Sequence, residues 1–186
     1  MTSVSALKHI HKAGLFGNHE NKNEESLLKV SEIKNLLIVQ IVQHKNSTVS
    51  FDSIDIDGLK LKNETLSVIS NNYTRILWNG PKNWLLVTTK KDLLKSILEN
   101  FKESDFAVTD LSHSRAIIEL EGQDAKEVLK KGCPFNFNIL VKNNSINSTY
   151  NGIAFTADML ENNPDKIRLF ALRRFGESLY LSLIHI

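Results

Sequence analysis

The only cysteine of the chain, Cys133, stands between Gly132 and Pro134 in the stretch VLKKGCPFNF, residues 128–137. A cysteine becomes a nucleophile where a cation or a helix N-terminus stabilises its thiolate. Cys133 instead follows a predicted helix, and the negative end of a helix dipole disfavours the thiolate. Gly132 is expected at the left-handed position that ends this helix, and Pro134 prevents its continuation. We therefore favour a structural Cys133 over a reactive one.

Two histidines, His9 and His11, are separated by one residue. On a strand both imidazoles would lie on one face, as they do in some metal sites. No third ligand is evident, and one cysteine cannot supply a thiolate zinc site or an internal disulfide. A solvated tail is the favoured interpretation, and no metal-binding residue is assigned.

Asp110, Ser112, His113 and Ser114 are the residue types of a hydrolase triad. Neighbours on one strand point to opposite faces, so these residues cannot form the relay geometry alone. No Gly-x-Ser-x-Gly motif is present to raise a serine off a strand. A turn held by local hydrogen bonds is favoured, and no catalytic residue is assigned.

Nucleotide-binding signatures are also missing, because the chain contains neither Gly-x-Gly-x-x-Gly nor a phosphate-cradling loop ending in Gly-Lys-Ser/Thr. Trp78 and Trp84 could stack on a planar ligand, although such rings are more often core or interface. Arg173 and Arg174 could clamp a carboxylate, but exposed basic residues are the usual case there. No cofactor-binding residue is assigned.

The composition describes the protein that must position these side chains. The chain has 186 residues, 41% of them hydrophobic and 24% charged, with a formal net charge of +2. These values are typical of a folded globular protein and give no electrostatic support for nucleic-acid or membrane binding. The first residues, MTSVSALKHIHKAG, lack the apolar core of a secretory signal, and LLIVQIVQ is much shorter than the ~20 residues that span a bilayer. A cytoplasmic location is expected.

Two segments are predicted from the patterning. Residues 1–27 are polar and show no period, which predicts an extended or partly disordered arm. Residues 28–186 are expected to form a single α+β domain of two related βαβ-type halves, about 28–104 and 105–186. The fold class is mainly antiparallel sheet with packed helices.

Individual elements follow from local signals. The first half predicts a strand over 30–45, with helix as the alternative, an Asp-Gly turn at 57–58, a short strand near 65–70, a hairpin of 75–78 with 84–88, and a helix over 90–104. The second half predicts strands over 105–112 and 114–122, a helix after Gly122 with a capping box from Asp124 to Glu127, strands over 146–160 and 166–174, and a helix over 174–186.

Three stretches together resemble the gamma subunit of bacterial heterotetrameric sarcosine oxidase: LWNGPKNWLLV, AVTDLSHSRAIIELEGQDAKEVLKKGCPFNF and ALRRFGESLYLSL. The short motif GLFG at 14–17 adds to this likeness. The motif positions occur in the family's order, and in this chain they are Gly80, Pro81, Trp84, Asp110, Ser112, Gly122, Gly132, Cys133 and Pro134. Residues 18–70 carry little of the pattern.

The resemblance implies a fold similar to one folate-binding domain of the aminomethyltransferase family. It further implies a non-catalytic subunit of an oxidoreductase that demethylates sarcosine to glycine, with hydrogen peroxide and either formaldehyde or methylene-tetrahydrofolate as products. The isolated chain is expected to be inactive. By the same resemblance this chain binds no cofactor, while FAD, FMN, NAD and tetrahydrofolate belong to alpha and beta subunits and zinc to a delta subunit.

Burial against these partners is the physical role that we expect, because subunits of obligate complexes bury large apolar areas. The arm and one aromatic face are the interface candidates, with Phe16, Trp84 and Phe175 as its residues. Two alternatives remain open: a stand-alone folate-binding protein of the aminomethyltransferase type, and a plain protein-interaction module.

Overall fold

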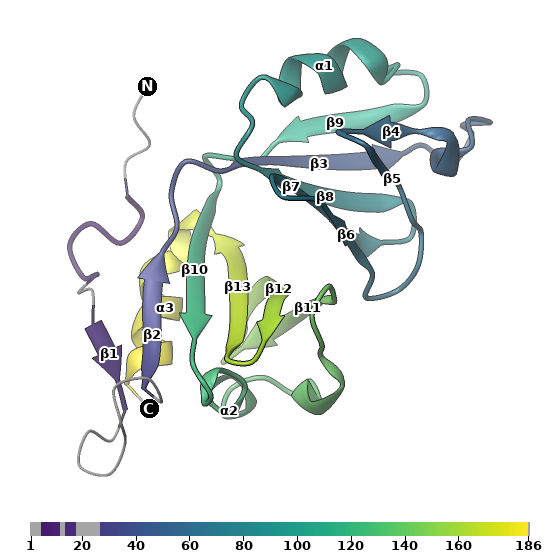
Figure 1. Ribbon diagram of the computed structural model, residues 1–186. Coiled ribbons are helices and arrows are strands. Elements are labelled where there is room, and N and C mark those ends of the chain that lie inside the picture. The colour runs from purple at the N-terminus through teal and green to yellow at the C-terminus, as the bar shows by residue number, and fades with distance from the viewer. Residues whose placement is uncertain (1–4, 12–13, 18–26, 186) are drawn as a thin grey trace. The chain divides into compact units, whose positions relative to one another are not determined.

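The computed structural model describes residues 5–11, 14–17 and 27–185. Contacts between residues divide the chain into two compact units, shown in Figure 1. Unit 1 combines residues 1–34 with 114–186, and unit 2 comprises 35–113. Each unit is built around its own antiparallel sheet.

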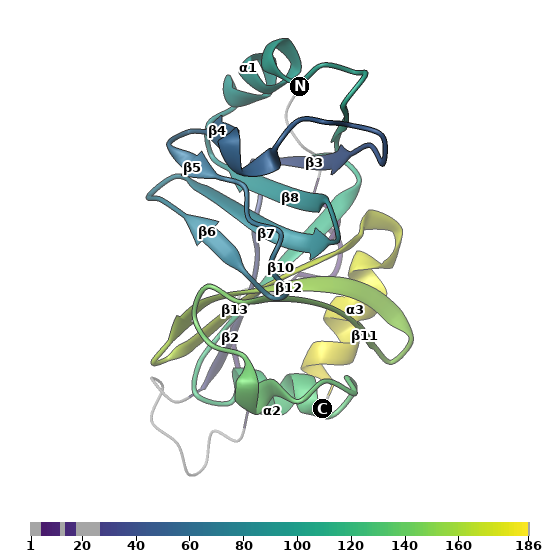
Figure 2. The same ribbon diagram turned by 90° about the vertical axis from the view of Figure 1, so that its right-hand side faces the viewer.

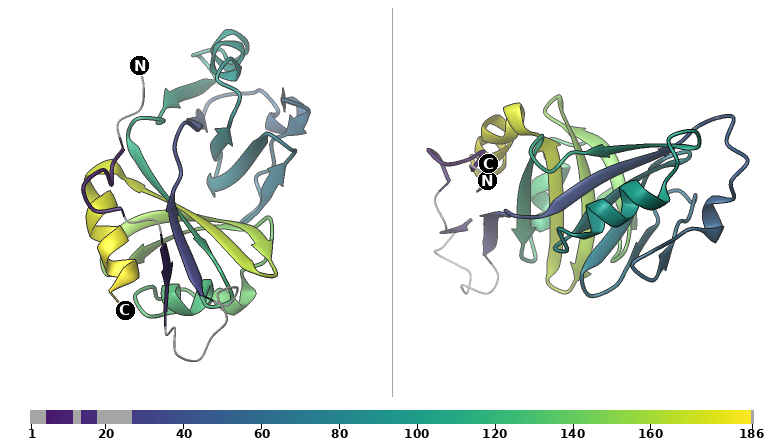
Figure 3. Two further views of the ribbon diagram at one scale, coloured as in Figure 1. Left: turned by 60° about the vertical axis from the view of Figure 1, so that its left-hand side comes forward. Right: turned by 90° about the horizontal axis from the view of Figure 1, so that it is seen from above.

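Unit 2 contains a five-stranded sheet in the order β6-β7-β8-β3-β9. Its strands are β3 (Leu37–Gln43), β6 (Val68–Ser70), β7 (Thr74–Gly80), β8 (Asn83–Thr88) and β9 (Phe106–Asp110). A short ribbon, β4 (Asp55–Ile56) with β5 (Leu59–Lys60), a 3-10 turn at Phe51–Ser53 and the helix α1 (Leu93–Asn100) complete the unit. Figure 3 shows α1 lying against this sheet.

The core of unit 2 lies on one face of that sheet. Trp84 of β8 and Ile41 of β3 stand opposite each other in register, and both are buried. Ile97 of α1 and Ile56 of the ribbon pack into the same cluster. The Trp84 indole donates a hydrogen bond to the Lys62 carbonyl at 2.6 Å, so the one polar atom of the ring is satisfied inside the unit.

Unit 1 contains a six-stranded sheet in the order β1-β2-β10-β13-β12-β11. Its strands are β1 (Gly14–Phe16), β2 (Leu28–Glu32), β10 (Arg115–Glu121), β11 (Ser145–Tyr150), β12 (Ile153–Asn162) and β13 (Asp165–Leu172). Its helices are α2 (Ala125–Lys130) and α3 (Gly176–Ile184), with 3-10 turns at Phe137–Ile139 and Arg173–Phe175. Figure 2 shows both helices on the same side of this sheet.

Strand register assigns the two faces of the unit 1 sheet, because residues directly opposite each other share a face. Ala116 of β10 pairs with Ala171 of β13 and lies under Gly176 at the start of α3. Leu120 and its partner Ile167 continue this helix-covered face, and both are buried. The alternate residues of β10 and β13 therefore form the opposite face, which we call the outer face: Arg115, Ile117, Glu119, Glu121, Lys166, Arg168, Phe170 and Leu172.

The predicted strand over 30–45 is wrong as a single element. It is divided into β2 of unit 1 and β3 of unit 2, separated at Asn35, whose φ is 64°. Asparagine tolerates this left-handed conformation better than most residues do, so the chain can turn there. β2 then pairs with β10, while β9 pairs with β3. Residues 28–104 thus contribute strands to both sheets.

Turn chemistry explains two further results. The predicted hairpin of 75–78 with 84–88 is confirmed as β7 and β8, with Pro81 and Lys82 at its tip. The predicted strand over 146–160 is wrong, because it is a hairpin of β11 and β12. Asn151 and Gly152 have φ angles of 47° and 84°, the geometry for which Asn-Gly is favoured.

The polar arm predicted for 1–27 is partly incorporated in unit 1. Leu7 is fully buried, and the Ala6 amide donates a hydrogen bond to the Glu32 carboxylate at 2.9 Å. Figure 3 shows this segment beside α3. Phe16 lies on β1, which pairs with β2. The rest of the arm, 1–4, 12–13 and 18–26, is outside the described residues.

The predicted helices are shorter than expected, and two terminal details are wrong. Asp124 precedes α2 but makes no side-chain cap hydrogen bond, so the capping box is not formed. Gly132 does not have a positive φ. A Cβ at Gly132 would lie 2.8 Å from two ring atoms of Tyr150, so close packing of that ring requires the glycine.

Candidate functional site

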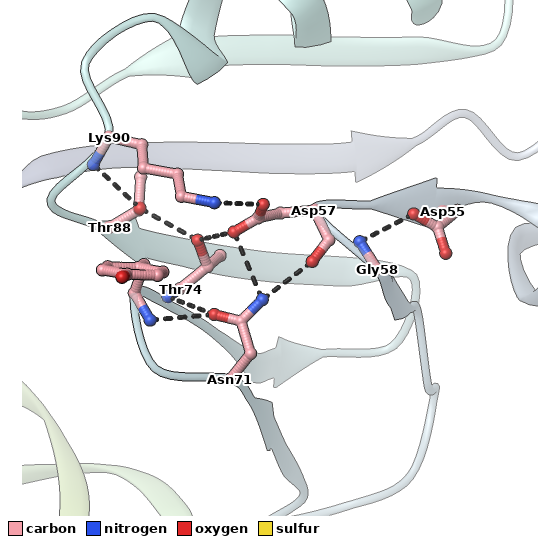
Figure 4. A network of polar contacts seen from close by, with 8 residues as sticks. Asp55, Asp57, Gly58, Asn71, Thr74, Thr88 and Lys90 are labelled. Carbon is pink, nitrogen blue, oxygen red and sulfur yellow. Dashed lines mark hydrogen bonds and ion pairs between the residues drawn. The ribbon is translucent and has the colours of Figure 1, made fainter.

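A network of polar contacts in unit 2 surrounds Asp57, as Figure 4 shows. Its carboxylate accepts hydrogen bonds from Lys90 Nζ at 2.5 Å, Thr74 Oγ1 at 2.6 Å and Asn71 Nδ2 at 3.2 Å. Thr74 is also hydrogen-bonded to Thr88 at 2.9 Å. The network therefore ties the turn of the β4–β5 ribbon to the ends of β7 and β8.

These contacts also fix the charge of Asp57. The hydrogen bond from Lys90 and then that from Thr74 lower the pKa of this carboxyl below its ordinary value. Lys90 lies 4.8 Å from the centre of the Tyr73 ring. A carboxylate stabilised in its ionised form is a poor general acid or base near pH 7, so this network holds the fold together.

The residues with triad chemistry form a local turn. Asp110 Oδ1 accepts hydrogen bonds from both the backbone N–H and the hydroxyl of Ser112. Ser112 Oγ in turn accepts a hydrogen bond from the Ile38 amide at 3.0 Å. The predicted structural turn is thus confirmed, and Ser112 connects it to β3.

Cys133 is buried, with 6% of its surface exposed, and its Sγ lies 3.1 Å from Ser148 Oγ on β11. The neighbouring Tyr150 ring packs on Gly132, and its hydroxyl donates to the Val128 carbonyl of α2 at 3.3 Å. The Gly-Cys-Pro sequence thus fastens the end of α2 to β11, which is a packing role.

His9 and His11 lie in different environments. His9 is exposed, while the His11 ring packs edge-on against Tyr180 of α3, with 5.5 Å between ring centres. Over the described part of the chain, no three His, Cys, Asp or Glu side chains cluster as metal ligands would. Likewise, none of the described helices has the length and apolar character needed to cross a membrane.

The aromatic candidates fall into two groups. Trp84 is only 1% exposed and belongs to the core of unit 2, so as an interface residue it is corrected to a core residue. Trp78 is half-buried, and its indole donates to Asn63 Oδ1 at 3.2 Å. Phe16 and Phe175 are half-buried on unit 1, where Arg174 covers the Phe175 ring at 4.5 Å.

Phe16 lines a groove in unit 1 of about 620 Å³. β1 contributes one wall, α2 another and the end of α3 a third. The groove carries an apolar floor and a charged rim: Leu15, Phe16, Gly17, Leu28, Asp124, Glu127, Val128, Lys131, Leu183 and Ile184. An apolar groove with a polar rim is the usual anatomy of a protein-binding surface.

The outer face of the unit 1 sheet carries an ion-pair cluster that sequence reasoning missed. Glu119 of β10 is only 8% exposed and is bound by Arg168 of β13, while Lys166 bridges Glu119 and Glu121 at 3.2 and 3.3 Å. Desolvation lowers the pKa of Lys166, but the charge of Glu119 and hydrogen bonds to both carboxylates outweigh it and raise this pKa overall. The sequence signal for this cluster is the alternation of charged residues in 115–121 and 165–172. It predicts ion pairs only once the two strands are known to be neighbours.

Two glycines of the family pattern have backbone reasons. Gly122 has a φ of 145°, and a Cβ there would lie 2.8 Å from the Leu27 carbonyl oxygen. Gly80 has a φ of 153° at a register shift between β7 and β8. Both positions disfavour side chains. Pro81 begins the turn between the two strands.

Comparison with known proteins adds a direct likeness. No family model matches the chain. A stretch of 62 residues is 37% identical to sarcosine oxidase subunit gamma of Corynebacterium sp. (strain U-96). This alignment covers 33% of the chain and 30% of that protein, so the chain matches less than a third of the length of its curated relative.

Solved structures extend the likeness to the whole fold. A chain of heterotetrameric sarcosine oxidase from Corynebacterium sp. U-96, solved with pyrrole 2-carboxylate, superimposes with a TM-score of 0.77 at 21% identity, over 92% of this chain and 86% of that one. Aminomethyltransferase T of the glycine cleavage system from Bartonella henselae gives a TM-score of 0.57 at 16% identity, over 83% of this chain and 44% of that one. The predicted α+β class and aminomethyltransferase-like fold are confirmed. This chain is therefore similar in sequence to sarcosine oxidase subunit gamma over 33% of its length, and similar in fold to a chain of heterotetrameric sarcosine oxidase over 92% of its length.

Proposed function

We propose that this chain is the gamma subunit of a heterotetrameric sarcosine oxidase and that it contributes to the complex without performing its chemistry. The observation that carries the proposal is the agreement of two likenesses. The sequence match is to a gamma subunit, and the fold match covers nearly the full length of both chains.

The same comparisons favour this role over a stand-alone aminomethyltransferase. Most of this chain corresponds to only 44% of aminomethyltransferase T. The sarcosine oxidase chain is instead matched over 86% of its length, with a TM-score of 0.77 against 0.57. The local surroundings of Ser112 and Cys133 agree with a non-catalytic chain, because both side chains serve turns and packing.

The proposed partners are alpha, beta and delta subunits. In this assignment FAD, FMN, NAD and tetrahydrofolate are held by the alpha and beta subunits and zinc by the delta subunit, and the assembled enzyme oxidises sarcosine in the cytoplasm. The contribution of this chain is surface burial against the flavin-bearing subunits.

The proposed contact surface is the unit 1 groove together with the ring of Phe175. Phe16 lines the groove, and Leu15 beside it is 36% exposed. Aromatic side chains, Phe included, are enriched at protein interfaces, and aromatic anchors in well-packed pockets often contribute much of the binding energy. Trp84 is excluded from this surface by its burial.

The test is co-expression of the tagged full chain with the genes that neighbour it, followed by purification, a visible spectrum and the masses of the bound chains. The expected result is a yellow complex that contains a large flavoprotein, while the chain expressed alone is colourless. A colourless chain that retains no flavoprotein under co-expression would overturn the proposal.

Point variants map the surface without disturbing the buried start of the chain. Phe16→Ser and Phe175→Ser are expected to reduce the recovered flavoprotein. Leu98→Ser is the matched control, because Leu98 is 56% exposed on α1 of unit 2. Equal recovery with all three variants would remove the groove and Phe175 from the interface. Calorimetric titration with tetrahydrofolate tests the alternative, since a stand-alone folate protein would bind it without partners.

A further inference from the structure

A second hollow of about 300 Å³ lies in unit 1, on the outer face of its sheet. It is formed by the ends of four neighbouring strands, β10, β13, β12 and β11, which run side by side in Figure 1. Its lining combines one cation with apolar and neutral polar residues: Arg115, Asn147, Ser148, Ala154, Phe155, Thr156, Phe170 and Leu172. The volume is at the lower end of the range of about 300–1,000 Å³ for small-molecule pockets.

Arg115 is the one charged residue of this lining. It is half-buried, and burial lowers the pKa of its guanidinium. Its side chain contacts Ser114 Oγ at 3.3 Å, and within the described ranges no carboxylate forms an ion pair with it. Removing a charge from water without a counter-charge is costly, so this position favours an anion.

Arg168 provides an internal comparison, because it also projects from the outer face. Its guanidinium donates two hydrogen bonds to Glu119, at 2.8 and 3.1 Å. The row of Arg115 instead places Leu172 opposite it, and Leu172 is 38% exposed. The sheet therefore supplies a carboxylate for one arginine and an open apolar surface for the other.

The remaining walls define what accompanies the anion. Half of the eight lining residues are apolar, among them Phe170, which is 2% exposed, and Leu172, which is 38% exposed. On the far wall Thr156 Oγ1 donates to Asn147 Oδ1 at 2.6 Å. No Asp or Glu is among the lining residues, so the hollow contains no group that would repel a negative ligand.

We propose that this pocket binds a carboxylate carried on a compact apolar body, with the carboxylate paired to Arg115 and the body packed on Phe170 and Leu172. An arginine can engage a carboxylate through two parallel hydrogen bonds. The site is independent of the proposed function, because none of its lining residues lines the proposed contact surface.

The test is a titration of the isotope-labelled full chain, followed by the backbone amide signals of Asn147, Thr156 and Phe170. Benzoate is the probe, and benzamide is its uncharged analogue of nearly equal shape. Benzoate is expected to give saturable shifts at these positions, and benzamide to bind at least about tenfold more weakly, because a hydrogen bond to a charged group is lost. Equal affinity for both probes, or no saturable shift with benzoate, would overturn the proposal.

A variant locates the charge. Arg115→Gln is expected to weaken benzoate binding by about tenfold or more, to the level of benzamide. Lys8→Gln removes an exposed cation of the same unit and should leave benzoate binding unchanged. The benzamide comparison on the unaltered chain decides the matter if Arg115→Gln does not fold.

Two sources can supply such a carboxylate, a free small acid or an acidic side chain of a partner chain. Repeating the benzoate titration on the purified complex, which rests on the proposed function, distinguishes them. Unchanged binding in the complex identifies a free acid as the ligand. Loss of binding, together with weaker assembly of Arg115→Gln, identifies a partner's carboxylate. Either result supports the pocket, whereas the free-chain titration alone can refute it.

Discussion

Glu119 and Arg168 stand directly opposite each other on β10 and β13, and the guanidinium donates two hydrogen bonds to the same carboxylate oxygen, from Nε at 3.1 Å and Nη2 at 2.8 Å. Their side chains are only 9% and 17% exposed. The pair therefore joins the two strands at a point where solvent screens little of its charge.

Removing one partner of this pair should be costly. We expect Arg168→Leu to lower the free energy of unfolding by about 1.5–3 kcal/mol, because the buried Glu119 would lose both hydrogen bonds from the guanidinium and keep only Lys166 as a counter-charge. Replacing both residues, as Glu119→Leu with Arg168→Met, should recover most of this loss. Urea unfolding of the three proteins measures the effect. A loss under about 1 kcal/mol for Arg168→Leu would place the pair among weak surface ion pairs.

The Asp57 network predicts a pH dependence. The pKa of Asp57 is lower in the folded chain than its ordinary value of 3.8, so its contribution to stability is complete above that value and decreases as the pH falls through the folded pKa. Asp57→Asn should therefore be less stable than the unaltered chain at pH 6, and this difference should shrink below about pH 4. Urea midpoints across the pH range test this. A difference that stays constant down to pH 3 would contradict it.

Gly122 and Gly14 form a matched pair for substitution by alanine. At Gly122 the backbone is in the left-handed range and the Leu27 carbonyl oxygen would lie 2.8 Å from the new Cβ, whereas none of the residues that the structure describes lies within 4 Å of a Cβ at Gly14. We expect Gly122→Ala to cost at least about 2 kcal/mol from backbone strain and crowding. Gly14→Ala should change the unfolding free energy by less than about 0.5 kcal/mol. Equal thermal unfolding of the two variants would disprove this account.

Leu7 should contribute to the stability of unit 1 although it lies in a polar segment. Its side chain is fully buried, so Leu7→Ala is expected to cost about 2–5 kcal/mol. The adjacent Lys8 is exposed, and Lys8→Ala should have an effect within about 0.5 kcal/mol. Chemical denaturation of both variants gives the comparison. A neutral Leu7→Ala would mean that residues 5–11 do not pack on the unit in solution.

Local sequence signals were sufficient to predict an element where a few neighbouring residues determine its conformation. The Asp57-Gly58 turn and the hairpin around Pro81 follow from residue type and period, and the structure confirms them. The predicted helix stripe of Phe175, Leu179 and Leu183 is confirmed for the two leucines, whereas Phe175 precedes α3 in a 3-10 turn. The turn at Ser112 was predicted for the same reason, because its hydrogen bonds join residues only two positions apart. The second hairpin turn, Asn151-Gly152, is likewise determined by local residue types, because both residues adopt a positive φ.

Longer-range features escaped prediction because they depend on which strands become neighbours. In the apolar run over 30–45, Asn35 is the strongest sequence signal that the run divides into two strands of different sheets. The residues around Leu7 show no hydrophobic period that would predict its burial. The pattern around Trp84 is equally compatible with a core residue and with an interface residue. Burial of this kind depends on residues far away in the chain.

The sequence by itself determined the α+β class, the likeness to the gamma subunit and the absence of recognisable catalytic motifs, because each depends on residue type, spacing or order. Only the tertiary structure decided which charges are paired. Arg115 and Arg168 have similar strand settings in the sequence, yet register places Glu119 beside one and Leu172 beside the other. An arginine's role depends on its cross-strand neighbour, since a buried charge must find its partner through space.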